Sequence, residues 1–474
     1  MTSQAVDHIA LLPLYAAAGT AILALLADLF AGKRAVTIAA TLLGTLATAV
    51  TALAAGAWDP TFCGPGGCSW VPTWPAAVTA ALFAGVTAAV LALSAPALRL
   101  GTAPAGEFCF LLACSMTGGV TVAYAGDLLT LIVGLETLTL PLYILVGLRR
   151  FAPGERATTT AASASVTFFL ISVISTAIAL LGVALNYAAT GAVHLGMLGP
   201  APAPFAALAG VGAALLVIGL AFKVAAVPLH AWAPATYDGA PVPIAAYLST
   251  ASKLGGVLAL AAVVARLDTS VIVAVLAVLT MTVGNLVALR QTRMVRLLAW
   301  SSVAQAGYIL AALALGGSGV PAALAYAVFF VVLELIAFGV VVALRPAGAD
   351  GGAIDDYRGA ARRHPWLGAA FVLALAGLAG LPPGLAGLFA KVSVVEALVA
   401  ESWTWLAVVV VVNAVIALAY YVRVGALVYT DPAVDDERRP VSRPVSRPVT
   451  AALLATTIVA VVLGFAPQVL LDAL

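Results

Sequence analysis

About fourteen stretches of the chain are long and apolar enough to cross a membrane, each offering roughly 20 mostly hydrophobic residues. The 474 residues are 63% hydrophobic and 9% charged, with a mean hydropathy of +1.12, which an ordinary soluble domain does not approach. The stretches begin near Ile9, Val36, Ala76, Phe108, Leu128, Thr160, Phe205, Pro243, Val271, Leu297, Pro321, Trp366, Trp405 and Thr450. We therefore predict an all-α polytopic membrane protein with about 14 transmembrane helices.

Positive charge is unevenly distributed among the loops that join these stretches. The first stretch has no basic segment before it and no small-residue cleavage site, so we predict a retained helix rather than a signal peptide. Because the predicted number of spans is even, both termini lie on the same side of the membrane. Nearly all Lys and Arg residues outside the stretches fall on the other side, except Arg266. Both termini are therefore predicted to face outward, and the net charge of +2 indicates no nucleic-acid partner.

The four cysteines form two close pairs in the sequence. Cys63 and Cys68 lie in a predicted outer loop, where either a disulfide or two free thiols would be reasonable, and Cys109 and Cys114 lie in a span. Neither pair has the spacing of a metal site, so no metal is assigned. The chain also lacks a glycine-rich dinucleotide fingerprint and a phosphate loop, so we expect it not to bind NADH itself.

Three of the four lysines lie inside apolar stretches, namely Lys223, Lys253 and Lys391. A charge at the bilayer centre costs about 2.5–3.5 kcal/mol on insertion scales, so each is a candidate functional residue. A desolvated lysine can lose its proton, whereas arginine stays charged. Proton handling is therefore the preferred interpretation. For Lys253, which follows several small residues, helix packing is the alternative to a relay role.

Glu136 is the only charged residue of its span, 131–141, and a lone carboxylate there must be protonated or paired. We predict that its partner is Lys223. Because a nearby carboxylate stabilises the charged form of lysine, moving the two apart would favour release of a proton. The pair is thus predicted to act as a switch, with a static structural ion pair as the alternative.

Two further buried residues are candidates with two interpretations each. Glu334, in an apolar span, is either a member of a proton path or a protonated hydrogen-bonding group. His230, at the predicted cytoplasmic end of its span, either loads protons or is a satisfied interfacial residue. The arginines of 290–296 fall at a predicted membrane interface, where topology alone explains them, and receive no role.

Helix-breaking residues are expected to interrupt two spans, at 226–234 after Lys223 and at 380–387 before Lys391. Broken helices at corresponding places in two halves are typical of inverted-repeat transporters. Since the two lysines lie five spans apart, we predict two inverted five-helix repeats. Lys391 is then the terminal relay toward the outside.

These features divide the chain into four parts. Residues 1–106 supply N-terminal transmembrane helices, 107–266 the first five-helix repeat and 267–430 the second, each forming half of a proton path. The last part, 431–474, is a linker followed by a C-terminal transmembrane helix. Within the linker, 439–449 repeats Arg-Pro-Val-Ser, and its prolines favour an extended tether.

Several motifs carry a family resemblance that covers about 108–429. Residues 219–232 (GLAFKVAAVPLHAW) resemble the signature of the antiporter-like membrane subunits of NADH-quinone oxidoreductase, respiratory complex I. Residues 237–253 (YDGAPVPIAAYLSTASK) and 300–308 (WSSVAQAGY) are similar to the subunit N group of that family. Further agreement comes from 134–136 and from 379–384, which leads to Lys391.

This resemblance implies a proton-translocating subunit with fourteen helices in the bacterial inner membrane. Glu136 and Lys223 match the paired residues of the family, Lys253 the central lysine and Lys391 the terminal one. Implied partners are other antiporter-like and small membrane subunits and a peripheral arm. FMN, iron–sulfur clusters and NADH would belong to other subunits, where quinone is reduced, and this chain would hold no cofactor.

The sequence departs from the family pattern in two places. The span around Thr167 lacks a lysine that many members carry beside the Glu–Lys pair, and Gln305 stands where a histidine is common. Both changes alter the titratable groups of the path. The alternative functions are therefore a subunit of a multisubunit cation/proton antiporter, or a diverged paralogue with a structural role.

Overall fold

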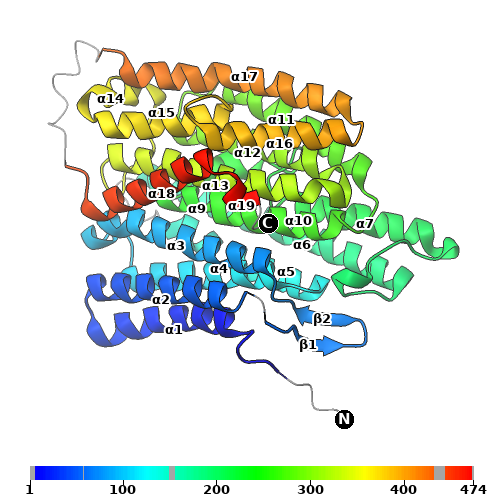
Figure 1. Ribbon diagram of the computed structural model, residues 1–474. Coiled ribbons are helices and arrows are strands. Elements are labelled where there is room, and N and C mark those ends of the chain that lie inside the picture. Colours follow the sequence, from blue (N-terminus) through cyan, green and yellow to red (C-terminus); the bar gives the residue numbers. More distant parts are fainter. Residues whose placement is uncertain (1–5, 57, 149–154, 432–443, 472–474) are drawn as a thin grey trace.

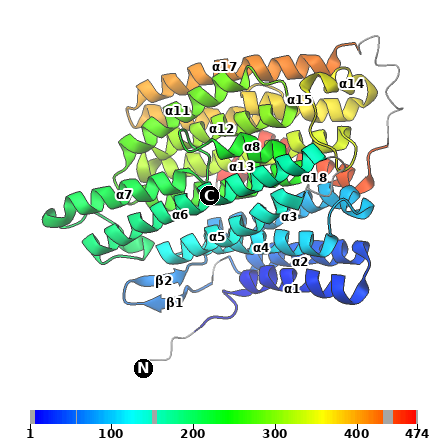
Figure 2. The same cartoon turned by 180° about the vertical axis from the view of Figure 1, so that it is seen from behind.

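Long helices running side by side make up nearly the whole molecule (Figure 1). The structure is a computed structural model that describes residues 6–56, 58–148, 155–431 and 444–471. In Figure 1 the helices run across the view, from α1 and α2 at the bottom to α17 at the top, and Figure 2 shows the same order from behind. Residues 439–443 of the predicted Arg-Pro-Val-Ser tether lie outside the described residues, and the predicted extended run to 449 is wrong at its end, because α18 begins at Arg447.

The helices follow one another along the chain with short connections. The α-helices are α1 (Leu12–Ala31), α2 (Arg34–Ala54), α3 (Trp74–Leu100), α4 (Ala105–Tyr124), α5 (Leu128–Gly147), α6 (Glu155–Thr190), α7 (Ala206–Ala221), α8 (Trp232–Gly239), α9 (Val242–Tyr247), α10 (Lys253–Val264), α11 (Ser270–Ala288), α12 (Met294–Leu313), α13 (Val320–Leu344), α14 (Ala360–Arg363), α15 (Pro365–Ala379), α16 (Leu385–Ala400), α17 (Thr404–Tyr429), α18 (Arg447–Phe465) and α19 (Gln468–Leu471). Between α9 and α10 lies one π-helical turn, η4 (Leu248–Ser252).

Each predicted apolar stretch contains a helix, which confirms the polytopic all-α architecture. Twelve helical segments in the described part of the chain are long and apolar enough to span a membrane. The other two predicted stretches, which begin near Leu297 and Trp366, also form helices, α12 and α15, but these are less apolar or shorter. Helix α12 carries polar side chains, among them Arg296 and Gln305, and α15 has only 15 residues because the chain breaks after it.

The most deeply buried helices are those that carry the central candidate residues. In the segments 242–264 and 316–344, 89% and 83% of an 18-residue apolar stretch is buried. The corresponding share is 22% in both α1 and α18. The first pair of segments contains Lys253 and Glu334, whereas α1 and α18 lie at the edge of the bundle. Exposed leucines and valines cover the outer helices, as expected where lipid or another subunit contacts them.

A β-hairpin at one end of the bundle was not predicted. Strand β1 (Thr61–Gly64) pairs antiparallel with β2 (Gly67–Trp70), and a disulfide joins Cys63 to its cross-strand neighbour Cys68. This settles the choice between disulfide and free thiols in favour of the bond. The intervening turn is rich in glycine and proline, a signal for a hairpin that the sequence already carried. Figure 1 shows the hairpin beyond the ends of α1 and α2.

The first helix break begins earlier than predicted. Because α7 ends before Lys223, this lysine lies in the non-helical segment itself, and the predicted break at 226–234 extends too far toward α8. Pro228 has no N–H to continue a helix and follows a cis peptide bond. The freed amide of Val227 donates instead to Thr280 Oγ1 on α11, at 2.9 Å. Irregular backbone at this depth is thus satisfied by a neighbouring helix.

The second break is shorter than the predicted range 380–387. It begins at Gly380, whose φ of +84° favours glycine, and the helix resumes as α16 before Gly387. Gly387 is needed for a different reason, since a Cβ there would overlap the carbonyl oxygen of Gly377. The close approach of α15 and α16 brings Lys391 back over the break.

Candidate functional site

Glu136 and Lys223 form the ion pair that the sequence predicted. Glu136 lies on α5, and its Oε1 is 2.7 Å from the Nζ atom of Lys223. The lysine side chain is 4% exposed and the glutamate side chain 23%. A buried ammonium depends strongly on its carboxylate partner. Any movement of α5 relative to the segment after α7 would therefore change how readily Lys223 holds its proton.

Hydroxyl groups complete this pair and were missed from the sequence. Thr176 on α6 donates to Glu136 Oε1 at 2.6 Å, and Lys223 Nζ donates to Ser172 at 3.1 Å and to Thr139 at 3.2 Å. Ser172 and Thr176 are four residues apart, so they share one helix face. That spacing was the available signal, but serine and threonine are common in spans and the pattern alone does not identify a partner.

Lys253 and Glu334 lie together in the most deeply buried part of the bundle. Lys253 begins α10 directly after η4, and its Nζ atom donates to the backbone carbonyl of Ser302 on α12. Glu334 on α13 is fully buried and interacts electrostatically with Lys253. Within the described part of the chain neither carboxyl oxygen of Glu334 has a hydrogen-bond partner. Both interpretations of Glu334, a member of a proton path or a protonated hydrogen-bonding group, stay predictions.

Lys391 is held by backbone rather than by a carboxylate. Its Nζ atom donates to the carbonyl oxygens of Leu378 and Ala379, each at 2.7 Å, at the end of α15. It also stands 5.1 Å from the ring centroid of Tyr308. The helix break exposes these carbonyls, as predicted. Lys391 thus has weaker charge compensation than Lys223.

Gln305 links Lys391 to a group of buried tyrosines. Its Nε2 atom donates to the Leu378 carbonyl at 2.9 Å and to the Tyr421 hydroxyl at 3.0 Å, and its Oε1 atom accepts from Tyr326. Gln305 and Lys391 therefore share one carbonyl oxygen. The glutamine is firmly oriented, although it cannot titrate.

A cavity of about 660 Å³ opens beside Lys391, between α16 and α17. Most of its lining is apolar, but Glu396 also borders it and is exposed. Glu396 lies one and a half turns further along α16 than Lys391. Sequence analysis did not select this carboxylate, which shares a cavity with the predicted terminal lysine.

His230 lies apart from the Glu136–Lys223 pair, in the segment that leads to α8. Its ring centroid is 5.1 Å from that of Trp300. Among the described residues no partner lies within hydrogen-bonding distance of its buried Nδ1 atom. Both interpretations of His230, proton loading or a satisfied interfacial residue, stay predictions.

Arg293 forms ion pairs, although no role was predicted for the arginines of 290–296. Its Nε atom contacts both oxygens of Asp238, at 3.0 and 2.8 Å, and its guanidinium reaches Asp350 at 3.0 Å. Hydrogen bonding to the Asp238 carboxylate raises the pKa of Arg293. Asp350 also pairs with Arg345. This network ties α8, of the first half, to the loops around α12 and α13.

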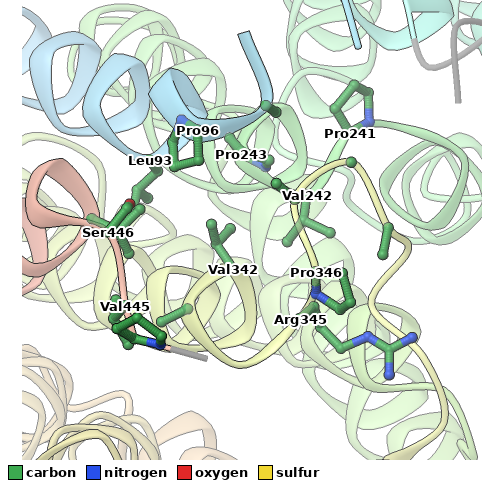
Figure 3. Close-up of a pocket in the computed structure, with 17 residues that line it drawn as sticks. Leu93, Pro96, Pro241, Val242, Pro243, Val342, Arg345, Pro346, Val445 and Ser446 are labelled. Atoms are coloured by element: carbon green, nitrogen blue, oxygen red, sulfur yellow. The ribbon is translucent and has the colours of Figure 1, made fainter. Parts of the chain in front are cut away.

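A second cavity lies apart from the candidate lysines and is shown in Figure 3. It has a volume of about 220 Å³ and is lined by Pro96, Pro243, Val342 and Val445, among others. Figure 3 shows the guanidinium of Arg345 pointing away from it. Within the described ranges no group of three or more His, Cys, Asp or Glu side chains could hold a metal ion.

Comparison with known proteins first defines the class. The sequence matches the family described as NADH:quinone oxidoreductase/Mrp antiporter, TM, over residues 125–417, more than half of the chain. A chain of the Mrp complex from Dietzia sp. DQ12-45-1b has the same fold, with a TM-score of 0.84 at 23% identity, covering 98% of this chain and 96% of that one. The broken helices and buried lysines therefore belong to an antiporter-like membrane protein.

More similar relatives define the group within this class. NADH-quinone oxidoreductase subunit N of Salinispora tropica is 56% identical over 99% of this chain and 98% of its own length. Subunit N 2 of Streptomyces griseus subsp. griseus is 42% identical, over 90% and 84%. A chain of respiratory complex I from Thermus thermophilus matches with a TM-score of 0.79 at 30% identity, over 97% and 98%. The chain belongs to the NADH-quinone oxidoreductase subunit N family, which confirms the predicted resemblance.

Proposed function

We propose that this subunit N family member translocates protons through Lys223, Lys253 and Lys391 and performs no redox chemistry itself. The observation that carries the proposal is the presence of three buried lysines whose partners differ in charge. Lys223 has a carboxylate, Lys253 a carbonyl beside Glu334, and Lys391 only carbonyls. Desolvated lysines can exchange protons when their surroundings shift. Glu334 and His230 serve the same path as additional proton-accepting groups.

The Glu136–Lys223 pair acts as the switch of this path. The carboxylate is 23% exposed, and Val133 and Leu140 on the same helix are 62% and 50% exposed. A neighbouring subunit packed against this side of α5 would reach Glu136 directly. Drawing the carboxylate away leaves the lysine with hydroxyl partners alone, and the proton is released.

The expected partners are the other antiporter-like and small membrane subunits and the peripheral arm of complex I. The peripheral arm would hold FMN and iron–sulfur clusters, oxidise NADH and reduce quinone. The two groups of spans at 107–266 and 267–430 each contain one broken helix with a lysine at the break, which supports two inverted repeats. Both termini face outward from the bacterial inner membrane in this arrangement.

A separate cation/proton antiporter is not favoured as the function. The likeness to the Mrp chain at 23% identity concerns the fold, whereas the subunit N relatives reach 56% over the whole length. A purely structural role is also not favoured, because burying three lysines without using them would cost insertion energy for no purpose.

The decisive experiment is Lys223→Ala in the native host. NADH-driven proton uptake is measured in inverted membrane vesicles after assembly of the complex has been verified. The matched control is Lys33→Ala, which removes the exposed lysine between α1 and α2. Loss of uptake with Lys223→Ala, with normal uptake in the control, supports the relay. Unchanged uptake in an assembled Lys223→Ala complex would contradict it.

A further inference from the structure

The route between Lys253 and Lys391 lacks a titratable side chain at position 305. Gln305 is 1% exposed and has an amide, which donates and accepts hydrogen bonds but does not exchange protons at neutral pH. The inference below rests on the proposed function, because it concerns how a proton passes this point. The groups in contact with Gln305 are therefore the relevant ones.

Tyr421 on α17 provides a hydroxyl at this point. It is 2% exposed, and its Oη atom lies 2.5 Å from Ser301 Oγ and 3.0 Å from Gln305 Nε2. The Gln305 amide group can only donate in this contact, so the tyrosine oxygen accepts. In its contact with Ser301 either oxygen can be the donor. A hydroxyl that accepts from Gln305 can at the same time donate to Ser301, which is the arrangement that a relay needs.

Ser301 lies next to the central group along α12. It precedes Ser302, whose carbonyl accepts from Lys253, and the Ser302 hydroxyl lies 2.9 Å from that of Ser249. Glu334 also interacts electrostatically with Tyr421, so the tyrosine lies within electrostatic range of the central carboxylate.

On the other side Gln305 links Tyr421 to Lys391, because its Nε2 atom also donates to the Leu378 carbonyl that accepts from Lys391. The cavity of about 660 Å³ borders Lys391, and one of about 270 Å³ borders Tyr421. They share the lining residues Ala379, Leu381 and Leu418. The linings of both cavities are almost entirely apolar, so the hydrogen bonds of Gln305 are the polar link between Tyr421 and Lys391.

We propose that Tyr421 is the proton-relay hydroxyl between the central group and Lys391, with Gln305 as the residue that positions it. When a proton arrives on the phenolic oxygen from one side, one O–H bond forms. The phenolic hydrogen leaves toward the other side, so one O–H bond breaks and the charge of the tyrosine is unchanged. Rotation about the C–O bond restores the starting orientation.

The test is Tyr421→Phe in the assembled complex, which removes only the hydroxyl. NADH-driven proton uptake and quinone reduction are expected to fall together by roughly a hundredfold, the low end of what a proton-transferring group contributes. The matched control is Tyr420→Phe, because this neighbouring buried tyrosine donates to Asn285 instead. The control is expected to retain normal uptake.

A second variant separates a relay from a structural role. Gln305→His, added to Tyr421→Phe, places a titratable ring beside the missing hydroxyl. Proton uptake is expected to return and to depend on pH across roughly pH 5–8, where histidine titrates. Lost packing or a lost hydrogen bond of Tyr421 would not be restored by this change.

The outcomes distinguish this inference from the proposed function. Normal uptake with Tyr421→Phe, while Lys223→Ala abolishes uptake, overturns the relay and leaves the proposed function intact. Loss in both variants with rescue by Gln305→His supports both, and loss without rescue overturns the relay. If Tyr421→Phe does not assemble, Ser301→Ala removes the acceptor of the same hydroxyl, and normal uptake in that variant also overturns the inference.

Discussion

Replacing Glu136 by glutamine is the most direct perturbation of the proposed switch. The amide keeps the shape of the side chain and its contact with Thr176 but removes the charge that lies 2.7 Å from Lys223 Nζ. Breaking a buried ion pair in this way costs about 3–5 kcal/mol. At about 1.4 kcal/mol per factor of ten, the ratio of charged to neutral Lys223 falls by roughly two to three orders of magnitude. The lysine is then expected to remain neutral and to stop cycling.

Two assays on the same vesicles measure this effect. NADH-driven proton uptake and quinone reduction should both fall by roughly tenfold or more, because the two are coupled and the switch accounts for several kcal/mol. Glu107→Gln is the control, since this carboxylate is exposed in the first turn of α4. An assembled Glu136→Gln complex with wild-type rates of uptake and quinone reduction would refute the switch and leave a static ion pair.

The remaining predictions concern residues that only the structure identified. Thr176→Val removes one hydrogen bond to Glu136, worth about 1.5–3 kcal/mol for a charged acceptor, so proton uptake should fall less than in Glu136→Gln; an equal or greater loss would contradict this ranking. Arg293→Ala breaks the ion pair with Asp238 and should lower the thermal midpoint of the solubilised complex. The decrease should be smaller at high salt, because Arg293 is 39% exposed. An unchanged midpoint would show that the network is not stabilising. Glu396→Gln should slow proton uptake without affecting assembly if the cavity it borders leads outward, and unchanged uptake would exclude it as the exit group.

The sequence predicted the residues for which burial carries a large energetic cost. A lysine or glutamate in an apolar span stands out against its neighbours, so Glu136, Lys223, Lys253, Lys391 and Glu334 could be selected without a structure. The pairing of the first two followed from the scarcity of other partners. Helix breaks were also visible, because proline and glycine interrupt otherwise apolar stretches.

The residues that complete the site could not be selected in the same way. Ser172, Thr176 and Tyr421 are residue types that a membrane helix tolerates easily, and their roles depend on which helix faces which. The first break begins at Phe222, before the residues that the proline pattern marked, and the amide of Val227 within it bonds to Thr280 on another helix, a contact that the sequence does not reveal. Buried charged residues can therefore be recognised in the sequence alone. Their hydrogen-bonding partners can be identified only from the packing of α6, α12 and α17.

The two departures from the family pattern receive one physical explanation. In the first half a lysine is absent near Thr167, and the same helix instead presents hydroxyls to the ion pair. In the second half Gln305 replaces a histidine, and the Tyr421 hydroxyl lies against it. A hydroxyl can donate and accept a proton at once, but it does not store charge near neutral pH. Under the proposed function, the three lysines, Glu136 and Glu334 would store protons and neutral hydroxyl groups would connect them, so substitutions of the two kinds should differ. Loss of a storing group should alter how strongly a proton is held, whereas loss of a connecting hydroxyl should mainly slow its transfer.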